Sequence, residues 1–203
     1  MPALDTIFID LDGVIRHWDG RDILAAERAI EVTPGTLFRA AFSPELLGKA
    51  ITGAITHEEW VDEVGAQLTA EIGSVCASAL VDAWGVAAWS IDHELLERIR
   101  VLVGTATLVL VTNATDRLGA DLSRAKLSTA FDVIVNSSEE GVAKPDASFY
   151  VRALERSGAT IEASVFIDDT RENVDAARAF GFESHHHTSR TTTLAFLARM
   201  LQT

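Results

Sequence analysis

The chain has 203 residues, of which 48% are hydrophobic and 23% are charged, a composition that fits one globular domain or a domain with a sizeable insertion. Its 17 Lys and Arg residues against 30 Asp and Glu residues give a formal net charge of −13, and no basic block stands out, which argues against a nucleic-acid partner. The single cysteine, Cys76, excludes an internal disulfide framework.

The sequence carries no signal for a membrane. Its first residues, MPALDTIFID, contain no basic segment followed by a long apolar stretch. The longest apolar run, over residues 101–111, is interrupted by Gly104, Thr105 and Thr107 and falls short of the roughly 20 residues of a membrane helix. We expect a cytoplasmic protein with no membrane span.

The first predicted element is a strand over Thr6–Ile9, and it ends directly in two acidic residues. Asp10 and Asp12 lie one residue apart and are followed by Gly13. Because carboxylates this close repel each other, we expect a cation or a proton between them. Three candidates to face a substrate follow this turn: Arg16, His17 and Trp18.

Residues 19–89 carry helix signals in place of strand signals. Ser43 before Pro44 is typical of a helix start, and Thr56 with Glu59 has the pattern of a capping box. Apolar residues then recur every three to four positions, as in a small helical bundle: Ile55, Trp60, Val61, Val64 and Leu68. The other notable side chains are expected in the bundle core (Trp60, Trp84 and Trp89) or on a solvated helix face (Arg39 and His57). We therefore predict an all-helical cap, a lid over a site, at residues 19–89.

From about residue 106 onward, short apolar runs alternate with amphipathic segments. We predict strands over residues 107–112, 131–136 and 164–168, and helices over residues 116–126, 148–157, 171–180 and 194–201. This alternation predicts a parallel sheet with helices on both faces. With the first strand, it gives an α/β fold, a Rossmann-like doubly wound parallel sheet built from residues 1–18 and 90–203.

Polar side chains follow each predicted strand. In an open α/β sheet, ligands bind at the carboxyl ends of the strands, so these side chains should meet at one edge. They are Asp10 and Asp12, Thr112 and Asn113, Lys144 in the next loop, and Asp168 and Asp169. Clustered carboxylates suit Mg²⁺, which leaves room for phosphate oxygens. A carboxylate can also attack phosphorus to give an aspartyl-phosphate, while a lysine and a cation neutralise the transferring group.

The triple histidine at residues 185–187 looks like a metal cluster. In a strand, however, only His185 and His187 share a face, and three adjacent side chains seldom converge on one ion. We expect a partly exposed sheet edge there instead.

The ordered motifs resemble those of the haloacid dehalogenase-like (HAD) hydrolases over the whole chain. The motifs are DLDG, TNAT, a lysine before proline, and DD followed by Asn173. The resemblance implies that Asp10 is the nucleophile and that Asp12 is the general acid/base. It implies phosphate binding by Thr112, Asn113 and Lys144. It implies Mg²⁺ binding by Asp10, Asp169 and the backbone carbonyl of Asp12, with support from Asp168 and Asn173. The helical insertion resembles the small helical cap of the family.

Asp12 distinguishes between branches of this family. True haloacid dehalogenases resemble this sequence but lack an acid two residues after the nucleophile. The resemblance therefore favours a Mg²⁺-dependent phosphatase acting on a small phosphorylated metabolite, with a sugar phosphate as the first expectation. The alternatives are a phosphomutase, a 2-haloacid dehalogenase of the same fold, and a non-catalytic binding module on this scaffold.

Overall fold

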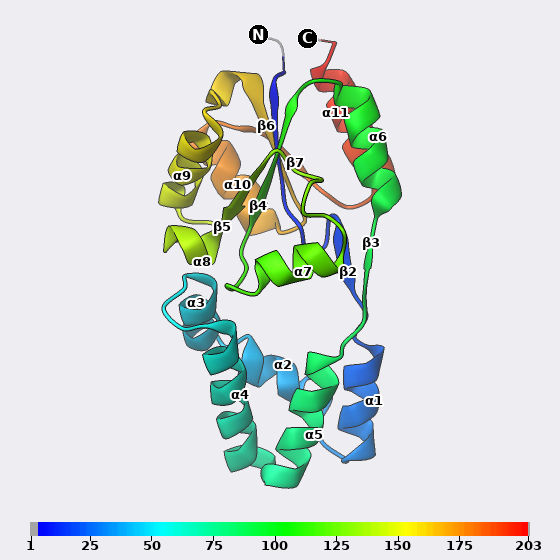
Figure 1. Ribbon diagram of the computed structural model, residues 1–203, viewed down its shortest axis with the longest axis vertical. Coiled ribbons are helices and arrows are strands. Elements are labelled where there is room, and N and C mark those ends of the chain that lie inside the picture. Colours follow the sequence, from blue (N-terminus) through cyan, green and yellow to red (C-terminus); the bar gives the residue numbers. More distant parts are fainter. Residues whose placement is uncertain (1–3, 203) are drawn as a thin grey trace.

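A five-stranded parallel sheet forms the centre of the upper half of the molecule in Figure 1, a computed structural model that describes residues 4–202. The strand order is β5 (Val133–Asn136), β4 (Thr107–Thr112), β1 (Thr6–Ile9), β6 (Ser164–Asp168) and β7 (Glu183–His186). All four neighbouring pairs are parallel. The predicted Rossmann-like α/β fold is therefore confirmed.

Alternating side chains of the strands pack against helices on both faces of this sheet. Ile7 and Ile9 point to the face covered by α6 (His93–Val103), α7 (Leu118–Arg124) and α11 (Arg190–Met200). Phe8 points to the face covered by α9 (Ala147–Ser157) and α10 (Arg171–Phe180). Two short helical segments complete this half, α8 (Ser137–Glu140) and the 3-10 turn η1 (Ile161–Ala163). Among the described residues, no helix is both long enough and apolar enough to cross a membrane.

Five helices between two short strands form the lower half of Figure 1, and we call residues 21–85 the helical insert. The helices are α1 (Arg21–Ala29), α2 (Thr36–Ala41), α3 (Pro44–Ile51), α4 (His57–Ile72) and α5 (Ser74–Gly85). They share a separate hydrophobic cluster that includes Leu37, Trp60, Val64 and Leu80. The two flanking strands, β2 (Arg16–Trp18) and β3 (Trp89–Ile91), pair antiparallel.

The predicted start of α4 is confirmed in atomic detail. Thr56 Oγ1 accepts a hydrogen bond from the Glu59 backbone N–H at 3.1 Å, and the Glu59 carboxylate accepts one from the Thr56 backbone N–H at 2.8 Å. Together these two bonds form the capping box. The neighbouring helix α3 begins at Pro44 as predicted, although the Ser43 side chain makes no capping hydrogen bond.

Several elements differ from the sequence-based prediction. Helix α6 was not predicted, although Asp92 caps it by accepting from the Leu95 N–H at 2.9 Å. Helix α11 begins four residues earlier than predicted because Ser189 caps it. Trp89 lies in β3 rather than in a helix of the bundle. Neither β2 nor β3 was predicted, because three-residue strands are too short to give a periodic signal.

Replacing Trp60 by Ala is expected to destabilise the protein by about 3–5 kcal/mol, because a large side chain would leave a cavity in the insert. Trp60 is only 7% exposed, its indole N–H donates to the Ala41 carbonyl at 3.0 Å, and its ring meets Trp84 edge-on at 4.9 Å. Urea denaturation measures the loss. The control is Val75→Ala, at a residue that is 82% exposed, for which we expect a change within about 0.5 kcal/mol. Equal stability of the two variants would contradict this packing.

Candidate active site

A cavity of about 260 Å³ lies at the carboxyl edge of the sheet. Asp10 directly follows β1, and Thr112 is the last residue of β4, so two neighbouring strands place their polar ends there. The lining residues are Asp10, Asp12, Gly13, Thr112, Asn113, Lys144, Asp169, Thr170 and Asn173. Every predicted site residue except Asp168 therefore lines this cavity, and Asp168 lies directly behind it in contact with Lys144.

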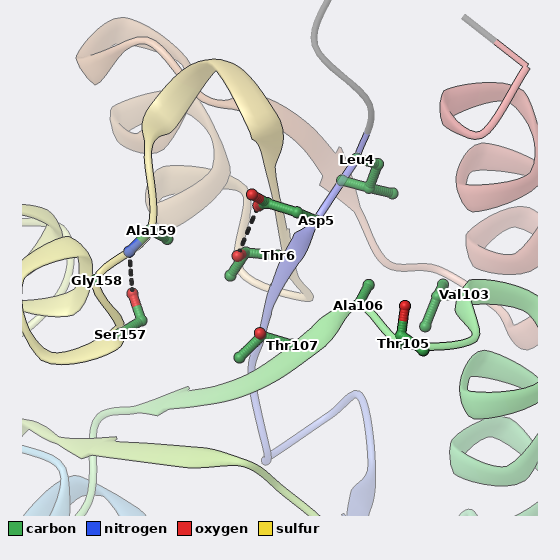
Figure 2. A pocket seen from close by; sticks show the side chains of 10 residues that line it. All are labelled: Leu4, Asp5, Thr6, Val103, Thr105, Ala106, Thr107, Ser157, Gly158 and Ala159. Atoms are coloured by element: carbon green, nitrogen blue, oxygen red, sulfur yellow. Dashed lines mark hydrogen bonds between the residues drawn. The ribbon is translucent and has the colours of Figure 1, made fainter.

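A second cavity, of about 300 Å³, lies at the opposite edge, where β1 and β4 begin (Figure 2). Its lining contains a single titratable side chain, Asp5, which accepts a hydrogen bond from Thr6 Oγ1 at 2.8 Å. The other lining residues are small or apolar: Leu4, Val103, Thr105, Ala106, Thr107, Ser157, Gly158 and Ala159. Without converging titratable groups, this cavity offers no acid–base or metal chemistry.

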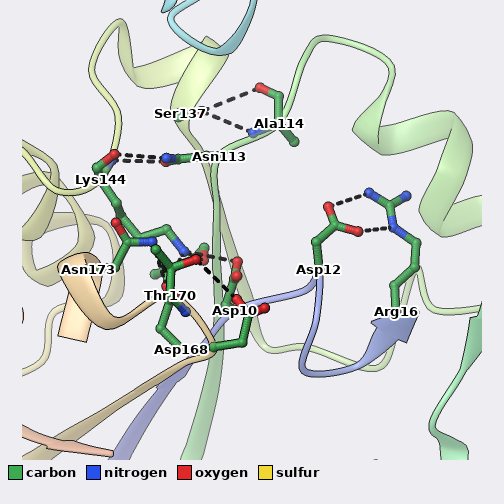
Figure 3. A network of polar contacts seen from close by, with 12 residues as sticks. Asp10, Asp12, Arg16, Asn113, Ala114, Ser137, Lys144, Asp168, Thr170 and Asn173 are labelled. Carbon is green, nitrogen blue, oxygen red and sulfur yellow. Dashed lines mark hydrogen bonds and ion pairs between the residues drawn. The ribbon is translucent and has the colours of Figure 1, made fainter. Parts of the chain in front are cut away.

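Lys144 lies between two buried carboxylates (Figure 3). Its Nζ is 2.9 Å from Asp10 Oδ1 and 2.6 Å from Asp168 Oδ2, and it donates to the Val111 carbonyl at 2.9 Å. Burial alone would lower the pKa of Lys144, but the charges of Asp10 and Asp168 outweigh it and the pKa is raised. The ammonium group therefore stays charged and uses all three of its donors inside the protein.

Asp10 is a buried carboxyl group whose pKa is raised to about 7. Burial is the largest cause, and the neighbouring charge of Asp168 adds to it, while Lys144 acts in the opposite direction. The charged form of Asp10 is thus short of compensating positive charge. A cation at this position would supply that charge and favour the carboxylate.

The Asp168 carboxylate is fully engaged by donors from the protein. Besides Lys144, it accepts from the Thr170 backbone N–H at 2.8 Å and from Asn173 Nδ2 at 3.1 and 3.2 Å. Its oxygens therefore have little capacity left for a ligand. Asp168 holds the lysine, and Asn173 holds Asp168.

Asp169 sits beside Asp10 with its carboxylate directed towards the turn after β1. Asp10, Asp168 and Asp169 each offer an oxygen within 4.8 Å of the others. Gly13, at φ +76°, makes room for this arrangement, because a Cβ atom there would lie 1.9 Å from Asp169 Oδ2. Burial, reinforced by the charge of Asp168, raises the pKa of Asp169. Since Asp168 is already engaged, oxygens of Asp10 and Asp169 are the ones suited to hold a hard cation such as Mg²⁺.

The Asp12 carboxylate is turned away from this group, towards Arg16 (Figure 3). Arg16 donates from Nε to Oδ1 at 2.7 Å and from Nη2 to Oδ2 at 2.8 Å, and the Trp18 indole N–H donates to Oδ1 at 2.7 Å. Arg16 is itself held by Asp121, at 3.0 Å. The sequence singled out Arg16 and Trp18, but it gave no signal for Asp121, which lies on α7 and is 105 residues away from Arg16 in the chain.

Asn113 and Lys144 are joined by a reciprocal pair of hydrogen bonds. The Lys144 N–H donates to Asn113 Oδ1 at 2.9 Å, and Asn113 Nδ2 donates to the Lys144 carbonyl at 2.8 Å. Asn113 thus fixes the lysine loop to the end of β4 while it lines the cavity. Thr112 beside it is buried, with 1% of its surface exposed.

The fold and the carboxylate-rich edge define a Rossmann-like α/β protein with an acidic site at the carboxyl ends of its strands. The family model described as haloacid dehalogenase-like hydrolase matches residues 4–181, so the chain belongs to the family that its motifs resemble.

Individual proteins of known sequence or structure are similar to this chain. Sesquiterpene phosphatase astK of Aspergillus oryzae is 37% identical over 71 residues, which are 35% of this chain and 36% of that protein. The alignments cover between 17% and 36% of the curated relatives, so the chain spans about a third or less of their length.

Solved structures share the fold over nearly the whole chain. HAD family enzyme bt-2542 of Bacteroides thetaiotaomicron, in complex with magnesium and inorganic phosphate, has a TM-score of 0.71 at 20% identity, covering 90% of this chain and 93% of that one. L-2-haloacid dehalogenase of Xanthobacter autotrophicus has a TM-score of 0.60 at 20% identity, covering 89% and 76%. At 20% sequence identity, this structural similarity establishes the shared fold.

In EDTA, Asp10→Asn is expected to stabilise the protein at pH 8 and to change its stability little at pH 4. The pKa of Asp10 is about 7 in the folded protein against 3.8 for a free side chain. The stabilisation that the neutral Asp10 carboxyl gives the folded protein is therefore fully present below pH 3.8 and is lost as the pH rises through 7. The side-chain amide of the Asp10→Asn variant does not ionise, so the variant keeps its stability over this pH range. At about 1.4 kcal/mol per pKa unit, the gain at pH 8 should be a few kcal/mol, measured by urea denaturation.

The matched control for this experiment is Asp175→Asn, at an exposed carboxylate on α10. It should show no gain at pH 8. A stability difference for Asp10→Asn that is the same at both pH values would contradict the raised pKa.

Proposed function

We propose that the protein is a Mg²⁺-dependent phosphatase that hydrolyses a small phosphomonoester through an aspartyl-phosphate on Asp10. The observation that carries this proposal is the position of Asp10, which lines an open cavity at the end of the central strand with Lys144 at 2.9 Å and Asp169 beside it. Residues 19–89 would form the cap over this cavity.

The residues of the site have distinct tasks in such a reaction. The Asp10 oxygen that is not paired with Lys144 attacks phosphorus, and the bond from phosphorus to the substrate oxygen breaks. Lys144, charged and rigidly held, offsets the negative charge at Asp10 and on the phosphoryl group. Mg²⁺ bound by Asp10, Asp169 and the Asp12 carbonyl would neutralise phosphate charge. Water then attacks the aspartyl-phosphate, which releases phosphate and restores Asp10.

Asp12 would protonate the departing oxygen and later take a proton from the attacking water. In the described conformation both Asp12 oxygens accept hydrogen bonds from Arg16, so protonation requires this contact to loosen. The presence of Asp12 supports phosphoester chemistry over dehalogenation. The intact set of Asp10, Lys144 and Asp169 supports an enzyme over a binding module.

The test is phosphate release from p-nitrophenyl phosphate and a panel of metabolite phosphomonoesters. We expect EDTA to abolish turnover, Mg²⁺ to restore it, and Asp10→Asn to lower kcat by at least about 10³-fold, because the covalent step loses its nucleophile. Asp175→Asn serves again as the matched control. A phosphate isomer appearing in place of inorganic phosphate would indicate a mutase. Full activity of Asp10→Asn would rule out the mechanism.

Exposed aromatic rings favour an apolar alcohol as the leaving group over the sugar expected from the sequence. Trp18 is 48% exposed, and its indole N–H is bonded to Asp12 Oδ1, the group that would protonate the leaving oxygen. On the insert, Phe38 and Phe42 are 48% and 43% exposed, with ring centroids 5.2 Å apart. Helix α2, which carries Phe38, lies below α3 in the half of the insert nearer the sheet (Figure 1). The two phenylalanine rings offer apolar contact and no hydrogen-bonding atoms for hydroxyl groups, and the indole N–H of Trp18 is already bonded to Asp12.

We therefore expect hexyl phosphate to have a higher kcat/KM than a hexose phosphate. Replacing both Phe38 and Phe42 by Ser should raise KM for hexyl phosphate about tenfold, the effect of roughly 1.4 kcal/mol of lost apolar burial, and leave KM for the hexose phosphate unchanged. Val75→Ser, at an exposed apolar residue where α5 begins, is the control and should change neither value. If the wild type and the double variant both had a higher kcat/KM for the hexose phosphate than for hexyl phosphate, the apolar substrate would be excluded.

A further inference from the structure

We propose that His186 is a positioning residue for Asp169, and that it holds the Asp169 carboxylate in the direction needed to bind a divalent cation. His186 ends β7, the edge strand beside β6, and its Nε2 is 2.8 Å from the Asp169 carbonyl oxygen. The inference rests on the proposed function, since it concerns the cation of that same site.

The hydrogen-bonding role of each ring nitrogen of His186 follows from its two neighbours. A carbonyl oxygen can only accept, so Nε2 must carry the hydrogen and donate it to Asp169. On the other side, Arg171 Nη2 is 3.3 Å from Nδ1, and a guanidinium can only donate, so Nδ1 accepts. One neutral tautomer satisfies both contacts, and Arg171 selects it.

Asp169 needs such support from its backbone because its carboxylate must stay available. Besides its own backbone N–H, the donor described for this carboxylate is Thr170 Oγ1, at a long distance of 3.3 Å. Asp168 next to it is different, since protein donors occupy its oxygens. A bond to the Asp169 carbonyl fixes the peptide unit after Asp169, and thereby the direction of the side chain, without using an oxygen that the cation needs. Partners of this kind, one shell beyond the metal, typically change metal affinity by about 10–100-fold.

The other two histidines of the motif have unrelated contacts. The His185 ring stacks on Phe196 with centroids 4.9 Å apart, and burial lowers its pKa to about 4. His187 is buried, and its Nδ1 is 2.8 Å from Thr193 Oγ1. Both partners belong to α11, whereas His186, which points to the opposite face of the strand, reaches the Asp169 loop. The three side chains therefore do not converge on one ion.

The test measures Mg²⁺ binding to the protein by calorimetry without substrate, and separately the Mg²⁺ dependence of p-nitrophenyl phosphate hydrolysis. We expect His186→Leu to weaken Mg²⁺ binding by about 10–100-fold while kcat at saturating Mg²⁺ stays within a few-fold of wild type. His186→Gln, whose amide N–H can still donate to the Asp169 carbonyl, should recover most of the affinity. Ser184→Ala, on the same face of β7, should bind Mg²⁺ like the wild type.

Several outcomes would overturn the inference. These are unchanged Mg²⁺ affinity in His186→Leu, equal loss in His186→Gln and His186→Leu, or a loss of kcat that saturating Mg²⁺ does not restore. Thermal unfolding of each variant separates these results from a general loss of folding. A wild-type protein that binds Mg²⁺ but hydrolyses no phosphoester would refute the proposed function alone, because the comparison of Mg²⁺ affinities would still decide the role of His186. A wild-type protein that binds no Mg²⁺ would refute both.

Discussion

The ion pairs of Lys144 with Asp10 and Asp168 are the interaction on which the rest of the site depends. All three side chains are almost fully buried, with exposures of 1%, 9% and 0%. Buried charges carry a large desolvation cost, and removing Lys144 from this set would leave buried carboxylates unpaired, a change that typically costs about 3–5 kcal/mol. One lysine between two carboxylates leaves an excess negative charge. Burial, together with the neighbouring charge of Asp168, raises the pKa of Asp10, and a cation bound beside Asp10 would offset both effects.

The fold brings these charges together because parallel strands share a carboxyl edge. β1 lies between β4 and β6 in the sheet, so Asp10, Thr112 and Asp168 reach the same edge from three neighbouring strands. The apolar part of each strand is buried between two helical layers, which fixes the positions at which the strands end. Gly13 then lets the chain turn close to Asp169, where any side chain would collide. The packing of the sheet thus sets the geometry of the charges.

The sequence predicted those features that are local in the chain. Asp10, Thr112 and Asp168 each end an apolar run, and the capping box of Thr56 and Glu59 is contained in four residues, so pattern and spacing were sufficient. The contacts of Arg16 with Asp121 and of His186 with Asp169 join residues that are 105 and 17 positions apart, and they exist only because tertiary packing brings the elements together. Helix α6 was missed because only three residues separate its apolar end at Val103 from β4, so in the sequence the two elements form one interrupted apolar run. Exposure of Phe38 and Phe42 could not be predicted either, since a helical pattern does not say which apolar face is left uncovered.

A chain of polar contacts connects the helical insert to Asp12. His57, the first residue of α4, accepts from Arg117 Nη1 at 3.1 Å, because a guanidinium can only donate, and its other nitrogen then donates to Thr115 Oγ1 at 3.2 Å. Burial, with the charge of Arg117, lowers the pKa of His57, which agrees with a neutral ring. Arg117 also pairs with Asp121, and Asp121 pairs with the Arg16 that holds Asp12. The helical insert and the Asp12 carboxylate therefore belong to one continuous set of polar contacts.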